Sequence, residues 1–569
     1  MKLTAAQIVV ETLKAEGITN VFGVSGSPTL PILDVIYDEP QIRYIQAQHE
    51  LNAMYMANGY ARATRGAGIC LVSPGPGITH CVSGVGVAYY TSTPSLLIAS
   101  EETTKFHNLG ISLHHDLDAV AILKPVTKLS LRVERADRIA QSLQMAFRTA
   151  LSGRKGPVYL GIAKNLLRDQ TEVEVVEVEV PPPQRYRVEM VPPAEPKFIS
   201  RAADLLVDSE RPVVMAGGGL AWAQAQDVLL ELAELLGIPV AATSENRGLI
   251  PGDHPLALST PTAAETMQDA DVLLAVGCSF DEFTTNGFGH EVVLREAKII
   301  QVDIDPTEIG KIYPVEVGVV GDARSVLHDL LHEIRNRKVD RRPVERLPRI
   351  KELLRKKREW QESTLSQRTS GKVPIQRFRL FHDLRQALPR DAIVAGASGG
   401  TGGWFGHAFE HLTYSYGIGS WHPLGAEYPE ALGVKVALPE RVVVCVTGDG
   451  SMMECLQEIA TAVAYDISVL CVVCHNGVFG NMRDTQLKLL GERFIGTDLP
   501  IPNLANIARE FGAYGERVGE PDEIIPAVGR ALESGKPALL EVMMDISPEN
   551  LRPPSGRTRR WITRGAQRS

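Results

Sequence analysis

The sequence predicts an α/β fold with three doubly wound parallel-sheet domains. Short apolar runs rich in valine and isoleucine alternate with segments of helical period along most of the 569 residues, a pattern typical of parallel strands joined by helices. Two stretches interrupt the pattern: residues 166–190 alternate valine with glutamate and end in prolines, and residues 337–358 are dense in charge. We therefore place domains at residues 1–165, 190–335 and 373–546, followed by a basic tail at 547–569.

Composition argues against nucleic-acid and membrane partners. The 59 basic and 68 acidic residues leave a net charge of −9, which gives no reason to expect binding to nucleic acid or to a membrane surface. We find no apolar run of about 18 residues, and the first 17 residues are typical of an amphipathic helix rather than a signal peptide. The seven cysteines lie mostly in apolar runs. Cys471 and Cys474 would face opposite sides of a strand, which favours core packing over redox or zinc chemistry. We expect a cytoplasmic protein.

The first domain has five predicted strands, at residues 21–24, 43–46, 68–72, 95–99 and 157–162. Glu50 follows the second strand and opens a helix, where a carboxylate complements the helix dipole. His80 follows a turn built from glycine and proline, and His114 and His115 are adjacent on a loop. Each position has an ordinary structural explanation as well as a functional one.

The second domain has predicted strands at residues 212–220, 238–243, 271–277 and 297–305. A glycine run, Gly217 to Gly219, lies near the end of the first of them, and Asp303 and Asp305 lie at the end of the last. This combination could hold a nucleotide, but a lone glycine run is more often a tight turn. Both interpretations stay open.

The third domain carries the clearest signal, a strand–helix–strand unit within residues 441–480. The first apolar run ends at Asp449, a helical period follows, and the second run ends at Asn476. Because both strands of such a unit open at the carboxyl edge of one sheet, we expect Asp449 and Asn476 to lie side by side. A carboxylate and an amide oxygen suit a hard divalent cation that keeps positions free for phosphate.

Glycines accompany these two residues and would admit a phosphate group. Gly448 and Gly450 allow close approach of the backbone, and the amides of Gly450 and Ser451 lie at a predicted helix N-terminus. An earlier strand ends in a glycine-rich loop, residues 398–403, whose exposed amides suit a terminal phosphate. The alternative is a glycine turn after any buried strand.

The segment Gly448-Asp449-Gly450-Ser451 and its spacing to Asn476 resemble the thiamine diphosphate and magnesium motif of the acetolactate synthase and pyruvate decarboxylase superfamily. The resemblance extends over nearly the whole chain. It implies thiamine diphosphate and Mg²⁺ as cofactors, with Asp449, Asn476 and the Val478 carbonyl as metal ligands. It also implies a homodimer or homotetramer whose active sites lie between subunits.

The same resemblance assigns the other cofactor contacts. Glu50 matches the catalytic carboxyl partner of the aminopyrimidine ring, and His80 stands where many members carry asparagine. Leu424 replaces the methionine that bends the cofactor, and the His422 carbonyl would face its 4′-amino group. The remaining expected cofactor-binding residues are Gly399, Gly400, Thr401, Gly448, Gly450, Ser451, Asn476, Val478 and Phe479.

Markers of the subfamily disagree with one another. His114 and His115 resemble the proton-transfer pair of pyruvate decarboxylase-like enzymes, whereas acetolactate synthases carry Phe-Gln in a comparable loop. Thr485 stands where acetolactate synthases have a tryptophan that helps to select the acceptor. The segments at 259–262 and 279–283 lack the flavin-contacting glycine and arginine of those enzymes. We therefore expect no FAD, and leave an adenine nucleotide or CoA open.

Two enzymatic activities follow from the resemblance. In the leading hypothesis, a thiamine diphosphate-dependent lyase or carboligase decarboxylates a 2-oxo acid and protonates or ligates the product, with His114 and His115 moving protons. In the alternative, a 2-hydroxyacyl-CoA lyase releases a carbonyl compound and formyl-CoA. His80, the missing flavin signature and the arginine-rich tail favour the alternative. A cofactor-free homologue is disfavoured, because Glu50, Asp449 and Asn476 are all present.

Overall fold

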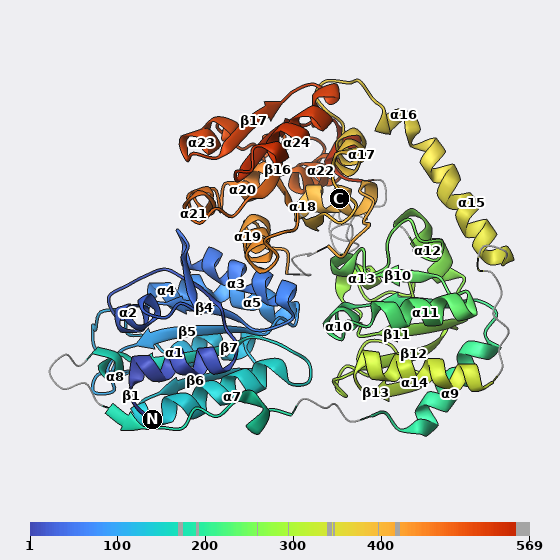
Figure 1. Cartoon of the computed structure of the whole chain (residues 1–569). Coiled ribbons are helices and arrows are strands. Elements are labelled where there is room, and N and C mark those ends of the chain that lie inside the picture. The colour runs from blue at the N-terminus through green and yellow to red at the C-terminus, as the bar shows by residue number, and fades with distance from the viewer. Residues whose placement is uncertain are drawn as a thin grey trace.

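Three parallel β-sheets, each with helices on both faces, make up the computed structural model of the chain (Figure 1). The structure describes residues 1–168, 175–188, 193–258, 260–293, 295–337, 344, 347–396, 398–415 and 421–553. Separate apolar clusters cover the two faces of the sheets. The predicted α/β class with three doubly wound parallel sheets is therefore confirmed.

The first sheet has six parallel strands in the order β3-β2-β4-β5-β7-β6. Its strands are β2 (Asn20–Gly23), β3 (Arg43–Gln46), β4 (Gly68–Val72), β5 (Ser95–Glu101), β6 (Leu129–Val133) and β7 (Val158–Ala163). Its helices are α1 (Ala5–Ala15), α2 (Leu30–Tyr37), α3 (Glu50–Thr64), α4 (Pro76–His80), α5 (Val82–Tyr90), α6 (Ala119–Leu123), α7 (Ile139–Leu151) and α8 (Lys164–Arg168). The predicted N-terminal helix is α1, and a capping box between Thr4 and Gln7 fixes its start.

The stretch at residues 166–190, predicted as a linker, forms a strand in part. β8 (Val175–Glu177) pairs antiparallel with β1 (Lys2–Thr4). Alternating valine and glutamate have the period of a half-exposed strand, which explains the pairing. Residues 169–174 and 189–192 lie outside the described part of the chain.

The second sheet has five parallel strands in the order β10-β9-β11-β12-β13. Its strands are β9 (Pro212–Ala216), β10 (Val240–Ala242), β11 (Val272–Val276), β12 (Lys298–Asp303) and β13 (Val317–Val320). Its helices are α9 (Pro196–Asp208), α10 (Gly218–Trp222), α11 (Gln226–Leu236), α12 (Thr260–Gln268), α13 (Glu282–Thr285) and α14 (Ala323–Asn336). A Cβ on Gly219 would lie 2.7 Å from the Cα of Gly277. Close packing of two turns thus explains the glycine run without a ligand.

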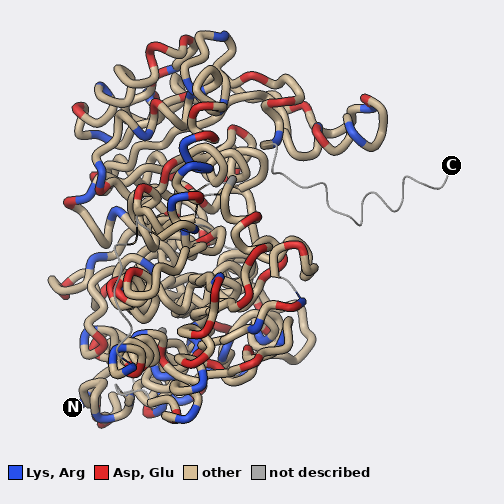
Figure 2. The backbone as a smooth tube through the Cα atoms, turned by 90° about the vertical axis from the view of Figure 1, so that its right-hand side faces the viewer, with Lys and Arg blue, Asp and Glu red and all other residues tan. Residues whose placement is uncertain are grey.

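The predicted charged segment contains a long surface helix, α15 (Pro348–Ser363), followed by α16 (Leu365–Arg368). Figure 1 shows α15 along the outside of the molecule, between the second and third sheets. Arg355 forms ion pairs with Glu352 and Glu359 on this helix. Acidic and basic residues are interspersed over the backbone as a whole (Figure 2). Among the described residues, no helix combines the length and the hydropathy that crossing a bilayer requires.

The third sheet has five parallel strands in the order β14-β15-β16-β18-β17. Its strands are β14 (Ile393–Ala395), β15 (Val443–Gly448), β16 (Val469–His475), β17 (Tyr514–Val518) and β18 (Ala538–Met543). Its helices are α17 (Arg377–Ala387), α18 (Gly399–Ala408), α19 (Glu427–Ala437), α20 (Asp449–Met452), α21 (Glu458–Ala464), α22 (Gly480–Leu490), α23 (Leu504–Glu510), α24 (Ile524–Glu533) and α25 (Pro548–Leu551). Cys471 and Cys474 are buried in different apolar clusters, as expected for opposite faces of β16.

Two expectations for the third domain are wrong in detail. The single helix predicted after Asp449 is two helices, α20 and α21, because hydrogen bonds from residue i to i−3 tighten the chain at Glu454 and Cys455. The predicted basic tail begins within the folded domain: the Asn550 carbonyl accepts hydrogen bonds from Arg377 Nε and Trp404 Nε1, both at 2.9 Å. The tail arginines Arg557, Arg559, Arg560, Arg564 and Arg568 lie outside the described residues.

Helices α3 and α19 join the first and third domains through one shared apolar cluster. The helices meet at glycines: a Cβ on Gly59 would collide with the Glu430 carbonyl oxygen, and one on Gly433 would collide with the Met56 carbonyl oxygen. Beside this crossing, the buried Arg62 guanidinium lies 3.4 Å from the buried Glu430 carboxylate. Figure 1 shows both helices between the first and third sheets.

Replacing Gly433 with alanine should destabilise the fold by about 1–3 kcal/mol, because the methyl group would push α19 away from α3. Urea denaturation measures the change. Gly529→Ala is the matched control: Gly529 is also helical, but a Cβ there has nothing within 4 Å. The control should gain roughly 0.5–1 kcal/mol from helix propensity. Equal shifts in the two variants would contradict the crowding argument.

Stability should also depend on pH through Glu430. Burial raises the pKa of this carboxyl from 4.5 to about 7, while Arg62 lowers it and Glu427 raises it. The folded state binds this proton more tightly than the unfolded state does. The stabilising contribution of Glu430 to the free energy of unfolding is therefore fully present below about pH 4.5 and is lost as the pH rises through 7. Glu430→Gln should therefore gain stability relative to wild type between pH 5 and pH 8.

Urea midpoints of wild type and Glu430→Gln at about pH 5 and pH 8 test this, with the exposed Glu440→Gln as control. We expect a relative gain on the order of 1–3 kcal/mol at the higher pH. A constant difference between wild type and Glu430→Gln across this range would show that the carboxyl titrates normally.

Candidate active site

Asp449 and Asn476 lie side by side at the carboxyl edge of the third sheet, as predicted. β15 and β16 are parallel neighbours with Gly448 opposite Cys474, so the residues that follow each strand adjoin. The buried Asp449 carboxylate accepts hydrogen bonds from the N–H groups of Asn476 at 2.9 Å and Gly477 at 2.6 Å. These bonds hold one carboxylate oxygen toward the loop, while the Asn476 side-chain oxygen accepts the Val478 N–H at 3.2 Å.

The glycine-rich segment after β14 is the first turn of α18 rather than the predicted loop. Gly399, Gly400 and Thr401 are its first three residues, and first-turn amides have no partner within a helix. A Cβ on Gly448 would lie 3.5 Å from the Thr401 hydroxyl oxygen, so this helix end adjoins the end of β15. Free amides and a helix dipole beside Asp449 suit an anion such as a diphosphate.

Gly450 and Phe479 complete the same edge of the sheet. A Cβ on Gly450 would lie 2.9 Å from the Phe479 ring, so only glycine lets the two segments approach this closely. The Phe479 N–H donates a hydrogen bond to the Thr497 carbonyl at 2.8 Å. The residues expected to bind cofactor after Asn476 are therefore fixed against α20.

Glu427, which the sequence analysis missed, ties three of the expected cofactor segments together. This fully buried carboxylate accepts a hydrogen bond from the Ser398 N–H at 2.8 Å and from the Ser451 hydroxyl at 2.6 Å. The Ser451 oxygen in turn accepts the Gly425 N–H at 2.7 Å. Burial raises the pKa of Glu427, and the bonds from Ser451 and Ser398 lower it. The sequence feature that could have revealed Glu427 is a glutamate at the start of a largely apolar helix.

His422 and Leu424 line a cavity of about 1450 Å³ between the second and third domains. His422 has a left-handed backbone with φ of 43°, and its ring meets the Phe283 ring edge-on at 4.7 Å. Gly399 also lines this cavity. Ligand pockets commonly measure about 300–1,000 Å³, so the cavity has room for a cofactor together with a substrate.

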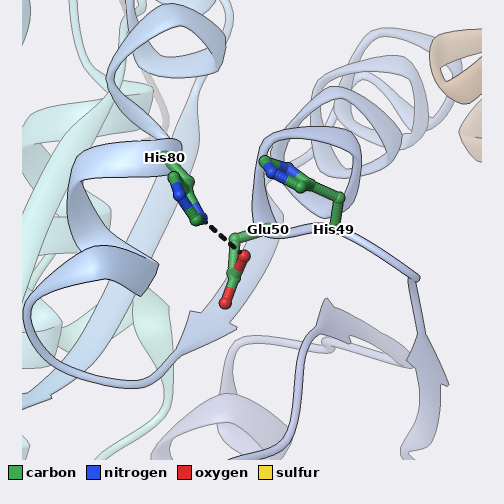
Figure 3. A group of neighbouring side chains, drawn as sticks. All are labelled: His49, Glu50 and His80. Carbon is green, nitrogen blue, oxygen red and sulfur yellow. Dashed lines mark hydrogen bonds and ion pairs between the residues drawn. The ribbon is translucent and has the colours of Figure 1, made fainter. Parts of the chain in front are cut away.

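Glu50 opens α3 as predicted and forms a compact group with two histidines (Figure 3). His80 Nδ1 lies 2.9 Å from Glu50 Oε2, and the His49 and His80 rings lie 4.6 Å apart. His49 caps the helix by accepting the Leu51 N–H. Burial and then His80 lower the pKa of His49, while Glu50 raises it. His80 is the last residue of helix α4, and its bond to Glu50 was not predicted.

His114 and His115 stack on each other, with ring centroids 3.6 Å apart. His115 has a left-handed backbone and packs on Gly75, where a Cβ would lie 2.8 Å from that of His115. The histidine pair therefore adjoins the turn that leads into α4 and His80. Burial lowers the pKa of His115, and His114 and Lys164 lower it further. Proton transfer by this pair stays a prediction.

A second buried acid, Glu458, fixes the start of α3 against the third domain. Its Oε1 accepts hydrogen bonds from the Gln48 N–H at 3.1 Å and the Asn52 side chain at 3.0 Å. Its Oε2 accepts the Thr461 hydroxyl at 2.7 Å. Burial raises the pKa of Glu458 despite these bonds. The backbone that carries Glu50 is thereby held on both sides.

Comparison with known protein families matches all three domains. The N-terminal TPP binding domain of thiamine pyrophosphate enzymes matches residues 3–122, the central domain matches residues 199–330, and the C-terminal TPP binding domain matches residues 398–542. The chain belongs to the thiamine pyrophosphate enzyme family. It is therefore a thiamine diphosphate-dependent enzyme, and the resemblance drawn from the sequence is confirmed.

Individual relatives of this thiamine pyrophosphate enzyme carry acetolactate synthase names. The chain is 32% identical to a probable acetolactate synthase large subunit of Methanocaldococcus jannaschii, over 98% of this chain and 94% of the relative. It is 32% identical to the acetolactate synthase isozyme 3 large subunit of Escherichia coli, over 93% of this chain and 92% of the relative. These similarities give no support to the 2-hydroxyacyl-CoA lyase alternative.

The residues of this thiamine pyrophosphate enzyme fit the cofactor. Paired carboxylate and amide oxygens suit Mg²⁺, the start of α18 suits the diphosphate, and the adjoining cavity is lined by Leu424 and His422. The individual contacts remain predictions, as does the lack of FAD. Of the segments behind that flavin prediction, Ser259 lies outside the described residues and Asp281 caps α13.

Asp449→Ala should weaken binding of thiamine diphosphate and Mg²⁺ at least about tenfold, because the metal would lose its carboxylate ligand. Calorimetric titration of the purified protein with both cofactors measures this. Asp391→Ala is the control, since Asp391 is an exposed aspartate of the same domain. An unchanged dissociation constant in Asp449→Ala would show that the metal binds elsewhere.

Proposed function

We propose that the chain is a carboligase of the acetolactate synthase type that acts on a 2-oxo acid. The observation that carries this proposal is the contact between Asp449 and Asn476 beside the start of α18. Relatives named acetolactate synthase, aligned over more than nine-tenths of the chain, support the 2-oxo acid as substrate. Decarboxylation with protonation of the product remains the simplest side activity.

Thiamine diphosphate, when bound, supplies the electron sink for the C–C bond that breaks in a 2-oxo acid. Asp449, Asn476 and the Val478 carbonyl would hold the magnesium ion. The Gly399, Gly400 and Thr401 amides would bind the diphosphate, together with Gly448, Gly450, Ser451 and Phe479. Leu424 and the His422 carbonyl would support the ring system from the cavity wall.

Glu50 would hold and release a proton at N1′ of the aminopyrimidine. Its carboxylate is well placed for this because α3 fixes the backbone, while the His80 imidazole orients the side chain through a 2.9 Å bond. The Glu50 side chain is only 17% exposed. His114 and His115 would exchange protons with the substrate.

We further propose that two subunits share each active site, with Glu50 of one chain serving the Asp449 edge of the other in a homodimer or homotetramer. The support is the family resemblance. Within one chain, Glu458 and α19 hold the first domain against the third, so the position of Glu50 is fixed relative to the third domain of its own chain.

Glu50→Gln should lower turnover of pyruvate by at least about 100-fold, because glutamine cannot exchange a proton with the cofactor ring. Steady-state consumption of pyruvate and formation of the ligated product measure the effect. Cofactor affinity should stay within a few-fold of wild type, since the diphosphate and metal contacts are intact. Glu11→Gln, on the exposed face of α1, should leave turnover unchanged. Near-normal turnover in Glu50→Gln would remove Glu50 from the reaction.

A further inference from the structure

We propose that Glu245, Arg247 and His411 form an anion-binding subsite in the cavity between the second and third domains. The subsite would recognise a carboxylate or phosphate at the end of the ligand away from the reacting carbon. This inference rests on the proposed function for its substrate class. All three residues line the cavity that His422 and Leu424 also line.

Two chain segments bring the three residues together. The Ser415 N–H donates a hydrogen bond to the Arg247 carbonyl at 2.9 Å, and the Gly252 N–H donates one to the His411 carbonyl at 2.8 Å. The His411 ring bonds to the Ser415 hydroxyl at 2.7 Å. The segment at 244–252 of the second domain therefore runs beside residues 411–415 of the third.

Arg247 brings a positive charge into the cavity that no neighbouring carboxylate neutralises. Within the part of the chain that the structure describes, no Asp or Glu oxygen lies within 4.0 Å of its guanidinium, and Nη1 donates to the Ser244 carbonyl at 2.7 Å. A Cβ on Gly406 would lie 2.5 Å from Nη2, so glycine lets the guanidinium rest on α18. Burial lowers its pKa to about 10, which leaves the group charged at neutral pH.

Glu245 does not act as the missing counter-ion. Burial and then Asp281 raise the pKa of its carboxyl to about 8, while Arg62 and Arg247 lower it. The group is therefore mostly protonated at neutral pH and offers an O–H donor. Its Oε1 atom is buried with no hydrogen-bond partner among the described residues. A protonated acid beside a guanidinium is suited to bind an anion rather than to repel it.

His411 adds a second polar atom without a partner among the described residues. The residue is 8% exposed, and its Nε2 atom is buried with no hydrogen-bond partner in the described part of the chain. Burial and then Arg247 lower the pKa of this imidazole, so the ring is neutral. Buried polar atoms without partners are costly, and a ligand oxygen or N–H in the cavity would satisfy this one.

The chemistry favours an oxyanion joined to an apolar chain. An uncompensated guanidinium next to an acid O–H matches a carboxylate, and aromatic rings of Phe283 and Phe405 line the same cavity. A 2-oxo acid with a second carboxylate would place one end here. The phosphate of a bound nucleotide presents the same charge, so the experiment separates these two sources.

The test compares 2-oxoglutarate with 2-oxopentanoate, which has the same carbon chain without the second carboxylate. Arg247→Met should lower kcat/KM for 2-oxoglutarate by about tenfold or more relative to 2-oxopentanoate, because charge-assisted bonds to the carboxylate are lost. Arg349→Met is the matched control: Arg349 is a partly buried arginine of α15 that donates to the Pro212 carbonyl and does not line the cavity. It should leave the ratio unchanged.

Calorimetric titration of wild type and Arg247→Met with glutarate and with ADP gives a readout independent of turnover. Loss of glutarate binding in Arg247→Met assigns the anion to the substrate, whereas loss of ADP binding alone assigns it to a nucleotide. Equal affinities of wild type and Arg247→Met for both probes, with an unchanged substrate ratio, would overturn the subsite. Absent turnover of every 2-oxo acid, with glutarate binding still lost, would instead refute the proposed function.

Discussion

The candidate cofactor site depends on one buried carboxylate, that of Glu427. Its two oxygens accept hydrogen bonds from Ser398 and Ser451, and Ser451 passes the connection on to Gly425. These segments follow β14, precede α19 and open α20, so no two of them are neighbours in sequence. Removing one partner of a buried polar network costs more than a surface bond contributes, because the remaining groups lose both water and partner. The geometry of the sheet edge is thus set by buried bonds of the protein itself.

The two interfaces between domains differ in the surroundings of their buried polar groups. Buried acids fasten the first domain to the third: Glu430 faces Arg62, and Glu458 binds Gln48 and Asn52. Between the second and third domains, by contrast, polar groups such as Glu245 and His411 have atoms that lack partners in the described chain. Glu430 Oε1 also lacks a hydrogen-bond partner among the described residues, but Glu430 lies at the helix crossing and does not line the cavity, whereas Glu245 and His411 do. An unpartnered buried atom therefore indicates space for a ligand only where it borders a cavity.

Much of this architecture could be predicted from the sequence. Buried strands such as β4, β11 and β16 are continuous apolar runs, and the adjacency of Asp449 and Asn476 follows from the topology of a strand–helix–strand unit. The strands β6, β13, β17 and β18 were not predicted. β6, β13 and β17 are edge strands that expose part of their residues and lack such runs. β18 is a buried strand between β16 and β17, and its apolar run could have been found in the sequence. The bonds of Glu427 and Glu458 and the contact of His80 with Glu50 join distant segments, which local periodicity does not reveal.

The crossing of α3 and α19 has a consequence for how such an enzyme can diversify. Helix α3 carries Glu50 at its start and, about three turns further on, Gly59 and Arg62, which contact α19 of the third domain. Substitutions along α3 must satisfy chemistry and assembly at once, so few are tolerable. The wall formed by residues 244–252 bonds to residues 411–415 of the third domain through backbone atoms of Arg247 and Gly252, so the side chains that line the cavity there do not make these two interdomain bonds. Substitutions of these cavity-lining side chains can therefore change substrate preference while α3 and α19 stay the same.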